Sequence, residues 1–394
     1  MHQSSTESIG SSPRARLLGA LGGPPAQRTA LRMVIAGVRS RAEIARESGL
    51  DTGTVTRAVT ALIEAQVLTE STGAVTSRPG RGRPSRPLHV AEEEFWAVGL
   101  HIGVRDITAS AVGLGGSSLA RVARRHDGSV ESALDACLQG TAAVRESMRT
   151  QPMGIGVAVG GRVDSRCGRI VEMPRLGWTD VPLADEIARA TGLPCTVRSM
   201  AQAQAQANVV YGQVSAKATF GHLYVGYIVE YCVVIGGEVW APEQRYGGAI
   251  DSLLLRTDDG RCGTVQELVS DDGILAQAHT AGLIVGDVDL DAVLDPSTDD
   301  PRERAALKGL LHHRAELVGD LVTQLQEVIA LPAVVMSASM ARQSDALDIV
   351  RERIAAGDDA RTPPDILSGG PVEIVNPRSG ACGYFETLFA EAGA

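Results

Sequence analysis

Apolar residues recur at helical spacing close to the N-terminal end of the sequence. The segment TALRMVIAGV, residues 29–38, places them three or four positions apart, which predicts a helix. These positions are Leu31, Val34, Ile35 and Val38. The serine-rich segment before it, residues 1–24, is expected to form a flexible leader.

Two further helices are predicted in residues 40–68, SRAEIARESGLDTGTVTRAVTALIEAQVL. Ser40 can cap the first, because its hydroxyl accepts a hydrogen bond from a free backbone N–H of the first turn. Gly49 can end it, since glycine adopts the left-handed conformation of a helix C-cap without strain. Asp51 can cap a second helix that begins at Thr52. The inward positions of that helix are Val55, Val59, Leu62 and Ile63.

The opposite side of this second helix carries small and hydroxyl-bearing residues with a single guanidinium. They are Thr52, Gly53, Thr56, Arg57 and Thr60, with Thr54 beside them. Such a face can enter the major groove of DNA and form hydrogen bonds with phosphates and base edges. A solvated helix surface is the alternative interpretation, and it is common for any single helix of this kind.

The next segment, TESTGAVTSRPGRGRPSRPLHV at residues 69–90, predicts two short strands around a turn. Its glycine, proline and arginine content keeps it extended and offers guanidinium groups to phosphates or to a narrow minor groove. The expected contacts are Arg81, Gly82, Arg83 and Pro84. Helix, turn, helix and basic wing in this order predict a winged helix-turn-helix that binds double-stranded DNA. The alternative is a flexible basic linker.

The charge of the chain is unevenly distributed. Residues 1–90 contain 12 Arg, no Lys and 6 acidic residues, a net charge of +6. The remainder contains 25 basic and 41 acidic residues, a net charge of −16. A cationic N-terminal part joined to an anionic remainder is expected if only the first part meets a polyanion.

Composition also restricts the cellular setting. No apolar run approaches the roughly 20 residues that a membrane span needs, and the N-terminal MHQSSTESIGSS has no apolar signal core. The six cysteines lie far apart without a CxxC pair, so reduced thiols are expected. The sequence therefore predicts a cytoplasmic, nucleoid-associated protein without membrane contact.

From residue 95 onward, segments of strand and helix character alternate, which predicts an α/β body. Strand signals lie in residues 95–121, 153–164 and 194–199. Helix signals lie in residues 131–148, 184–192 and 201–212.

The order of these segments resembles the ROK family (repressors, open reading frames, sugar kinases), in particular its repressor branch. The likeness rests on the helix-turn-helix with its GRGRP wing and on GIGVAVGGRVDSRCGRIVEMPRLGWTDVPLADEIARATGLP, residues 154–194. It implies a winged helix-turn-helix at residues 25–90 and a two-lobed, actin-like (ribonuclease-H-like) body at residues 91–394. Lobe one would cover about 91–205 and 371–394, and lobe two about 206–370, with a ligand cleft between them.

The motifs that sugar kinases of this family use for ATP and catalysis are altered here. The first phosphate turn, DIGGT-like in the kinases, reads HIGVR at 101–105, and the second, GTGIGGG-like, reads GYIVEYC at 226–232. Side chains in such turns keep phosphate away from backbone N–H groups. The resemblance places the kinase general base at Met200, which has no carboxylate, and the late glycine block at 337–339, which reads SAS. We therefore expect neither kinase activity nor a cofactor.

The sugar and zinc signatures of the family are altered as well. Its sugar-binding glutamate and histidine correspond to Ala249 and Ser252, so a simple hexose would lose hydrogen-bond partners. Its CxCGxxGC zinc block is reduced to RCGT at 261–264. Because zinc takes about four ligands, Cys262 is interpreted as a small core residue, and no metal is expected.

The segment VGYIVEYCVVIGG, residues 225–237, contains the altered second phosphate turn and admits two interpretations. It is either a core strand that keeps the fold packed, or part of a cleft for a non-phosphorylated effector lined by Tyr227, Glu230 and Tyr231. Clefts with a few polar groups among apolar walls are where small molecules bind. By family position, the candidate effector cleft also includes Arg175, Arg198, Met200, Gln202, Ala249 and Ser252.

Together these observations predict a DNA-binding transcriptional repressor whose body forms a homodimer or a dimer of dimers. One winged helix covers one half-site, so paired half-sites require paired readers. The body would bind an effector other than a simple hexose, or none. Two alternatives remain open: a sugar kinase with an appended DNA-binding domain, and a ligand-independent regulator whose body only dimerises.

Overall fold

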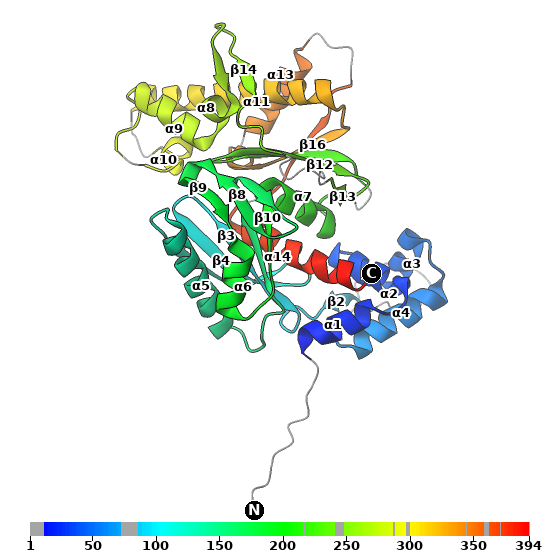
Figure 1. Cartoon of the computed structure of the whole chain (residues 1–394). Coiled ribbons are helices and arrows are strands. Elements are labelled where there is room, and N and C mark those ends of the chain that lie inside the picture. The colour runs from blue at the N-terminus through cyan, green and yellow to red at the C-terminus, as the bar shows by residue number, and fades with distance from the viewer. Residues whose placement is uncertain are drawn as a thin grey trace, which may run out of the picture.

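The computed structural model describes residues 12–71, 86–215, 218–240, 248–286, 288–296, 300–343, 345–357, 362–370 and 372–393. Figure 1 shows a small N-terminal unit of helices beside a larger body built on two five-stranded sheets. Among the described residues, none of the helices combines the length and apolar character that a membrane span requires.

The N-terminal unit comprises residues 12–71 and 86–90. Its elements are α1 (Pro13–Leu21), α2 (Pro25–Ile35), α3 (Arg41–Ser48), α4 (Thr52–Glu64), β1 (Leu68–Glu70) and β2 (Leu88–Val90). α2 begins earlier than its apolar spacing indicated, because Pro25 suits the first turn of a helix, where an N–H has no partner. Ser40 caps α3 by accepting the Glu43 N–H at 3.2 Å, and Gly49 ends that helix with a φ of 73°. β1 and β2 pair antiparallel.

Helix α1 was not expected from the sequence. Ser12 caps it through the Ala15 N–H, and both Leu17 and Leu21 are fully buried in a core that includes Phe389 of the C-terminal helix. The flexible leader predicted for residues 1–24 is therefore wrong over residues 13–21, because an apolar partner from the far end of the chain covers this short helix. Residues 1–11 lie outside the described part of the chain.

The first sheet of the body has the strand order β10-β6-β3-β4-β5. β3, β6 and β10 run parallel, whereas β4 and β5 continue antiparallel from β3. The strands are β3 (Trp96–Ile102), β4 (Asp106–Gly113), β5 (Ser118–Arg125), β6 (Ile155–Val159) and β10 (Cys195–Ser199). α5 (Val130–Glu146) and α6 (Leu183–Thr191) pack on one face, and α14 (Val372–Glu391) packs on the other.

Two features complete this half of the body. A three-stranded sheet of β7 (Arg162–Asp164), β8 (Arg169–Met173) and β9 (Trp178–Val181) extends from the end of β6, with the single turn η1 (Pro174–Leu176) between β8 and β9. α14 lies directly on β6, since glycines meet there: a Cβ added to Gly156 would come within 2.0 Å of the Gly380 carbonyl oxygen.

The second sheet repeats the pattern of the first, with the order β13-β12-β11-β16-β17. β11, β16 and β17 run parallel, and β12 and β13 continue antiparallel from β11. The strands are β11 (Phe220–Val225), β12 (Val229–Ile235), β13 (Glu238–Val239), β16 (Ala333–Ala338) and β17 (Asp365–Ser368). α11 (Pro301–Val328) and α13 (Ala346–Ala355) pack on one face of this sheet.

The remaining elements surround the second sheet. They are the hairpin β14 (Leu254–Arg256) and β15 (Cys262–Thr264) and the helices α8 (Val265–Val269), α9 (Asp271–Thr280), α10 (Asp291–Leu294) and α12 (Ser339–Arg342). α7 (Met200–Val210) lies between the two sheets, packed on β11 and β12 from one side and near β6 and β10 on the other (Figure 1). The alternating strand and helix order that the sequence predicted is thus arranged as two sheets of the same topology.

Candidate functional site

The exposed face of α4 is fixed by the cap at its start. Asp51 Oδ1 accepts the Thr54 N–H at 2.9 Å, and hydrogen bonds from the Thr54 hydroxyl and N–H hold the pKa of the Asp51 carboxyl below its usual value. The inward side of the helix is buried at Val55, Ala58, Val59 and Leu62. The outward side is exposed at Thr52, Gly53, Thr56, Arg57 and Thr60. The structure therefore gathers these small and hydroxyl-bearing side chains on one solvent-facing surface.

Arg57 is positioned along this face by a neighbour on the same helix. Its Nη2 donates to the Thr54 hydroxyl at 2.9 Å, so the guanidinium extends toward the start of α4. Thr56 donates its hydroxyl hydrogen to the Thr52 carbonyl, which leaves the oxygen lone pairs of Thr56 available as acceptors. The start of α4 thus presents one cation together with several acceptors.

The strand pair β1–β2 follows α4. Arg41 of α3 forms an ion pair with Glu70 of β1, and the His89 ring of β2 lies 2.7 Å from the Ser71 hydroxyl. Residues 72–85 lie outside the described ranges. The predicted contacts at Arg81, Gly82, Arg83 and Pro84 fall among them and stay predictions.

The N-terminal unit is joined to the body by a continuous apolar core. Leu17, Leu31 and Leu62 share one buried cluster with Phe385 and Phe389 of α14. Polar contacts surround this core: Arg32 of α2 pairs with Glu386 of α14 at 2.9 Å, and its guanidinium lies 4.2 Å from the centre of the Phe389 ring. Arg14 of α1 pairs with Glu391 at 2.8 Å. Helices α1, α2 and α4 are thus packed against the body, and the exposed face of α4 is held in a fixed position relative to it.

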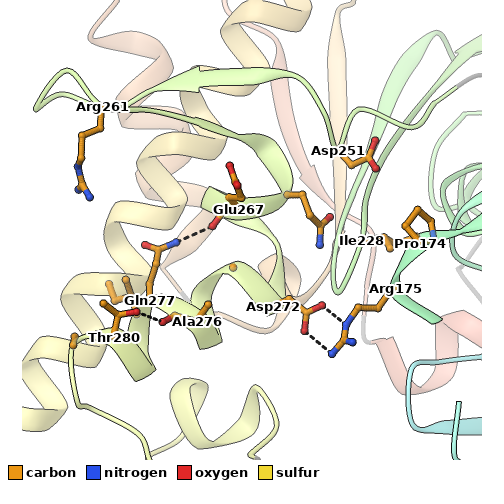
Figure 2. A pocket seen from close by; sticks show the side chains of 14 residues that line it. Pro174, Arg175, Ile228, Asp251, Arg261, Glu267, Asp272, Ala276, Gln277 and Thr280 are labelled. Atoms are coloured by element: carbon orange, nitrogen blue, oxygen red, sulfur yellow. Dashed lines mark hydrogen bonds and ion pairs between the residues drawn. The ribbon is translucent and has the colours of Figure 1, made fainter. Parts of the chain in front are cut away.

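A pocket of about 800 Å³ opens between η1 and the helices α8 and α9 (Figure 2). Its polar lining consists of Arg175, Asp251, Arg261, Gln266, Glu267, Asp272, Gln277 and Thr280. Its remaining lining consists of Gly273 and the apolar residues Pro174, Ile228, Ala276, Ala281 and Leu310. Arg175 of η1 pairs with Asp272 of α9, with 3.1 Å between Nη2 and Oδ1. This ion pair connects the two halves of the body at the side of the pocket.

Glu230 of β12 lies beneath the junction of the two halves and is only 4 % exposed. One carboxylate oxygen accepts the Gly161 N–H at 2.8 Å, and the other accepts the Ala201 N–H at 2.9 Å. Burial raises the pKa of the Glu230 carboxyl to about 7, although hydrogen bonds from Ala201, Gly161 and Ser199 lower it in part. The Asp251 carboxylate raises it further.

The other predicted cleft residues are dispersed. Met200 is buried in the apolar cluster around α7, and Gln202 is buried on the same helix with no partner for its Oε1 among the described residues. Arg198 lies beside Gly383 of α14. Ser252 is exposed, and Ala249 forms an isolated bridge with Glu230.

Tyr227 and Tyr231 pack against different apolar clusters. Tyr231 follows Glu230 on β12 and therefore points to the opposite face of the second sheet, into the core beneath α11. Tyr227 is half-buried in the turn before β12, against the cluster formed by α9, α10 and α11. Of the nine residues predicted for the cleft, Arg175 alone lines the 800 Å³ pocket. The structure therefore does not bring the nine together around one cavity.

Sequence reasoning missed most of the pocket lining. Asp251 is next to Ser252, a position that the family likeness had marked. Asp272 lies two residues after Ser270, the cap of α9. Neither aspartate belongs to a motif. A local signal does exist for α8, because Thr264 and Glu267 form a reciprocal capping box. It identifies a helix start but not a wall of a pocket.

The positions that correspond to kinase motifs hold His101, Ile228 and Met200. Burial lowers the pKa of His101 to about 4, which keeps its ring neutral. Ile228 occupies the second turn, where a Cβ added to Gly160 would come within 2.3 Å of the Ile228 Cδ1. Met200 is 1 % exposed. Met200, at the position of the kinase general base, therefore supplies no carboxylate.

The interpretation of Cys262 as a core residue is wrong. Cys262 is exposed at the start of β15, because it lies on a short hairpin at the outer edge of the body. Within the described residues, no group of three or more His, Cys, Asp or Glu side chains is arranged to hold a metal ion.

The sequence of this chain is similar to those of known proteins. The profile of the ROK family matches residues 97–358. The protein named Transcriptional regulator Rv0485, of Mycobacterium tuberculosis, is 30% identical over 328 residues, which cover 80% of this chain and 74% of that protein. The chain belongs to the ROK family.

Solved structures share the fold. A ROK family transcriptional regulator, described as a homolog of the E. coli MLC protein, superposes with a TM-score of 0.66 at 18% identity, covering 95% of this chain and 97% of the other. A ROK family glucokinase from Streptomyces griseus in complex with glucose and AMPPNP superposes with a TM-score of 0.60 at 19% identity, covering 74% of this chain and 98% of the other. The family and the α/β fold that the sequence predicted are thereby confirmed.

Proposed function

We propose that this chain is a DNA-binding transcriptional regulator, a repressor, whose kinase-like body does not phosphorylate sugars. The observation that carries the proposal is the exposed face of α4, where Thr52, Thr56 and Arg57 stand on a helix capped by Asp51 and held by its buried side. The relative from Mycobacterium tuberculosis, which bears the name of a transcriptional regulator, supports the same function.

The arrangement of the N-terminal unit suits a winged helix-turn-helix. α3 and α4 are joined by a short turn at Gly49, Leu50 and Asp51, and the pair β1–β2 follows as the base of a wing. α4 would enter the major groove with Thr52, Gly53, Thr54, Thr56 and Arg57 near bases and phosphates. The segment with Arg81, Gly82, Arg83 and Pro84 would follow the adjacent backbone or minor groove.

The body would supply dimerisation and, through the pocket beside α9, a site for a small effector. Each N-terminal unit offers one α4, so an operator with two half-sites requires a homodimer or a dimer of dimers. The pocket has apolar walls at Ile228, Ala281 and Leu310 and a few polar groups, which is typical of small-molecule sites. Since Ala249 and Ser252 cannot reproduce the polar contacts of the family's sugar site, we expect an effector other than a simple hexose.

The substitution Arg57→Ala and the double substitution Arg81→Ala with Arg83→Ala should weaken DNA binding in different ways. If Arg57 contacts a base, its loss should cost about 1–3 kcal/mol and relax the preference at one position of each half-site. Loss of Arg81 and Arg83 removes phosphate contacts, so binding should weaken evenly over all sequences and depend less on salt. Gel-shift titrations at two salt concentrations, on sequences selected from genomic DNA by the purified protein, measure both effects.

Arg189→Ala is a matched control for the loss of one surface cation. Arg189 is exposed on α6 of the body, where it pairs with Glu186, and no DNA contact is proposed there. This variant should bind the selected operator with wild-type affinity. Wild-type affinity in both the Arg57 variant and the double variant would show that the winged-helix assignment of these residues is wrong.

The purified protein should show no hexose-dependent ATP turnover and should contain no stoichiometric zinc. Met200 has no carboxylate to accept a proton from a sugar hydroxyl, a contribution typically worth about 10²–10⁴ in rate. A coupled ATPase assay with a panel of hexoses, with the Streptomyces griseus glucokinase as positive control, measures the first quantity, and elemental analysis measures the second. Turnover above background would favour the alternative of a sugar kinase with an appended DNA-binding domain.

A further inference from the structure

The carboxylate of Glu230 joins three elements that belong to different parts of the body. Glu230 itself lies on β12 of the second sheet, Gly161 lies in the turn after β6 of the first sheet, and Ala201 lies in the first turn of α7. We propose that this carboxylate is a proton-controlled contact that closes the two sheets on α7, and that α7 transmits its state to α2 of the N-terminal unit.

The middle of α7 is tied to both sheets by a buried chain of polar side chains. Gln204 donates to Asn376 of α14 at 2.7 Å, and Asn376 in turn lies 3.3 Å from the His101 ring of β3. On the other side, the His222 ring of β11 lies 3.2 Å from Gln204 Oε1 and 3.3 Å from Asn208. Because these groups are buried and bonded to one another, α7 cannot shift its middle without breaking them.

The far end of α7 lies against the N-terminal unit. Gly212 follows the helix with a φ of 74°, and a Cβ added there would come within 2.3 Å of the Ala36 carbonyl oxygen at the end of α2. Val210 and Tyr211 pack against the same apolar core as α1, α2 and α4. With 11 residues, α7 is about 16 Å long and connects the Glu230 contact directly to α2.

The charge state of this contact changes near neutral pH. Burial raises the pKa of Glu230 to about 7, whereas an exposed glutamate has a pKa of about 4.3. The closed contact therefore binds a proton more tightly than an opened one, so it is stronger below pH 7 and weaker above it. The neighbouring polar and ionisable groups are Asp251, Ser199, Tyr224 and Cys232. Asp251 in turn lies 4.0 Å from the Arg162 guanidinium.

Four buried ionisable groups near α7 keep one protonation state in this range. Burial lowers the pKa of His101 to about 4 and that of His222 to about 3, so both rings stay neutral between pH 6 and pH 8. Burial raises the pKa of the Tyr224 hydroxyl and of the Cys232 thiol, so both stay protonated. α7 itself carries no charged side chain. A change between these two pH values is thus assigned to Glu230.

Hydrogen exchange followed by mass spectrometry on the full chain without DNA tests the proposal. In the wild type, after correction for the intrinsic exchange rate, segments 200–210 and 33–38 should exchange about tenfold faster at pH 8 than at pH 6. Opening at pH 6 must release the proton that Glu230 holds in the closed state, whereas at pH 8 Glu230 is already ionised and opening releases none. In Glu230→Gln, which cannot ionise, that difference should disappear from both segments. Glu238→Gln, an exposed glutamate of β13 in the same sheet, should keep the wild-type difference.

The outcomes separate the two steps of the proposal. Wild-type exchange in residues 200–210 that is equal at the two pH values would overturn the proton-controlled contact. A pH effect in residues 200–210 without one in residues 33–38 would overturn transmission to α2. Because the wild type alone supplies both pH values, poor folding of a variant leaves these outcomes readable. No DNA is present, so either failure leaves the assignment of α4 as a DNA-binding helix intact.

Discussion

Replacing Asp271 with alanine should lower the free energy of unfolding by about 3–5 kcal/mol. The side chain of Arg314 is fully buried on α11, with 2.6 Å between its Nη2 and Asp271 Oδ1. Without that carboxylate, a guanidinium charge would remain buried, and its remaining acceptors within the described ranges would be the Val269 carbonyl and the Ser339 hydroxyl. Urea unfolding followed by circular dichroism measures the change.

Asp272→Ala is the matched control, because it removes the neighbouring carboxylate. Asp272 is partly exposed and pairs with the exposed Arg175 across the pocket, so its loss should lower the free energy of unfolding by at most about 1 kcal/mol. Equal losses in the two variants would contradict the buried ion pair as the source of the effect. Replacing both partners, as Asp271→Leu with Arg314→Met, should restore much of the stability.

Glu230→Gln should reduce the dependence of stability on pH by about 2–3 kcal/mol between pH 5 and pH 8. The pKa of Glu230 is raised to about 7 in the folded chain, so the folded state binds the proton more tightly than the unfolded state does. Its contribution is therefore fully present at low pH and is lost as the pH rises through 7. Thermal and urea unfolding of both proteins at several pH values measure the difference between them.

The comparison of the two pH profiles isolates one residue. Every other ionisable group is present in both the wild type and the variant, so its contribution to the pH dependence cancels in the difference. Parallel profiles would mean that Glu230 titrates in the folded protein as it does in the unfolded chain, and its burial would then have no energetic consequence.

Local sequence signals account for the elements that are determined by their own residues. Asp51 predicts the start of α4, and the spacing of Val55, Val59 and Leu62 predicts its buried side, because caps and helical periodicity act within a few residues. Gly49 predicts the end of α3 in the same way. The alternation of strands and helices in the body could be predicted from the sequence for the same reason.

Features that depend on distant residues were not predictable in this way. α1 has only Leu17 and Leu21 as buried residues, and their cover includes side chains of α14. Glu230 was recognisable as an unusual carboxylate in an apolar strand, but its partners are backbone N–H groups at positions 161 and 201, which no side-chain pattern reveals. The pocket likewise joins η1 to α9, two segments about 97 positions apart, as the pair of Arg175 and Asp272 shows.

The packing of α14 against the N-terminal unit has a consequence for biosynthesis. Arg32 and its partner Glu386 are 354 positions apart, so α1 to α4 leave the ribosome long before the helix that completes their core. Leu17, Leu31 and Leu62 then lack the cover of Phe385 and Phe389 until translation reaches them. Domains generally fold as they emerge, starting from the N-terminal end. Here α1 to α4 are synthesised early, but the side chains of α14 that complete their core are added last, so this unit reaches its full stability only after α14 has been synthesised.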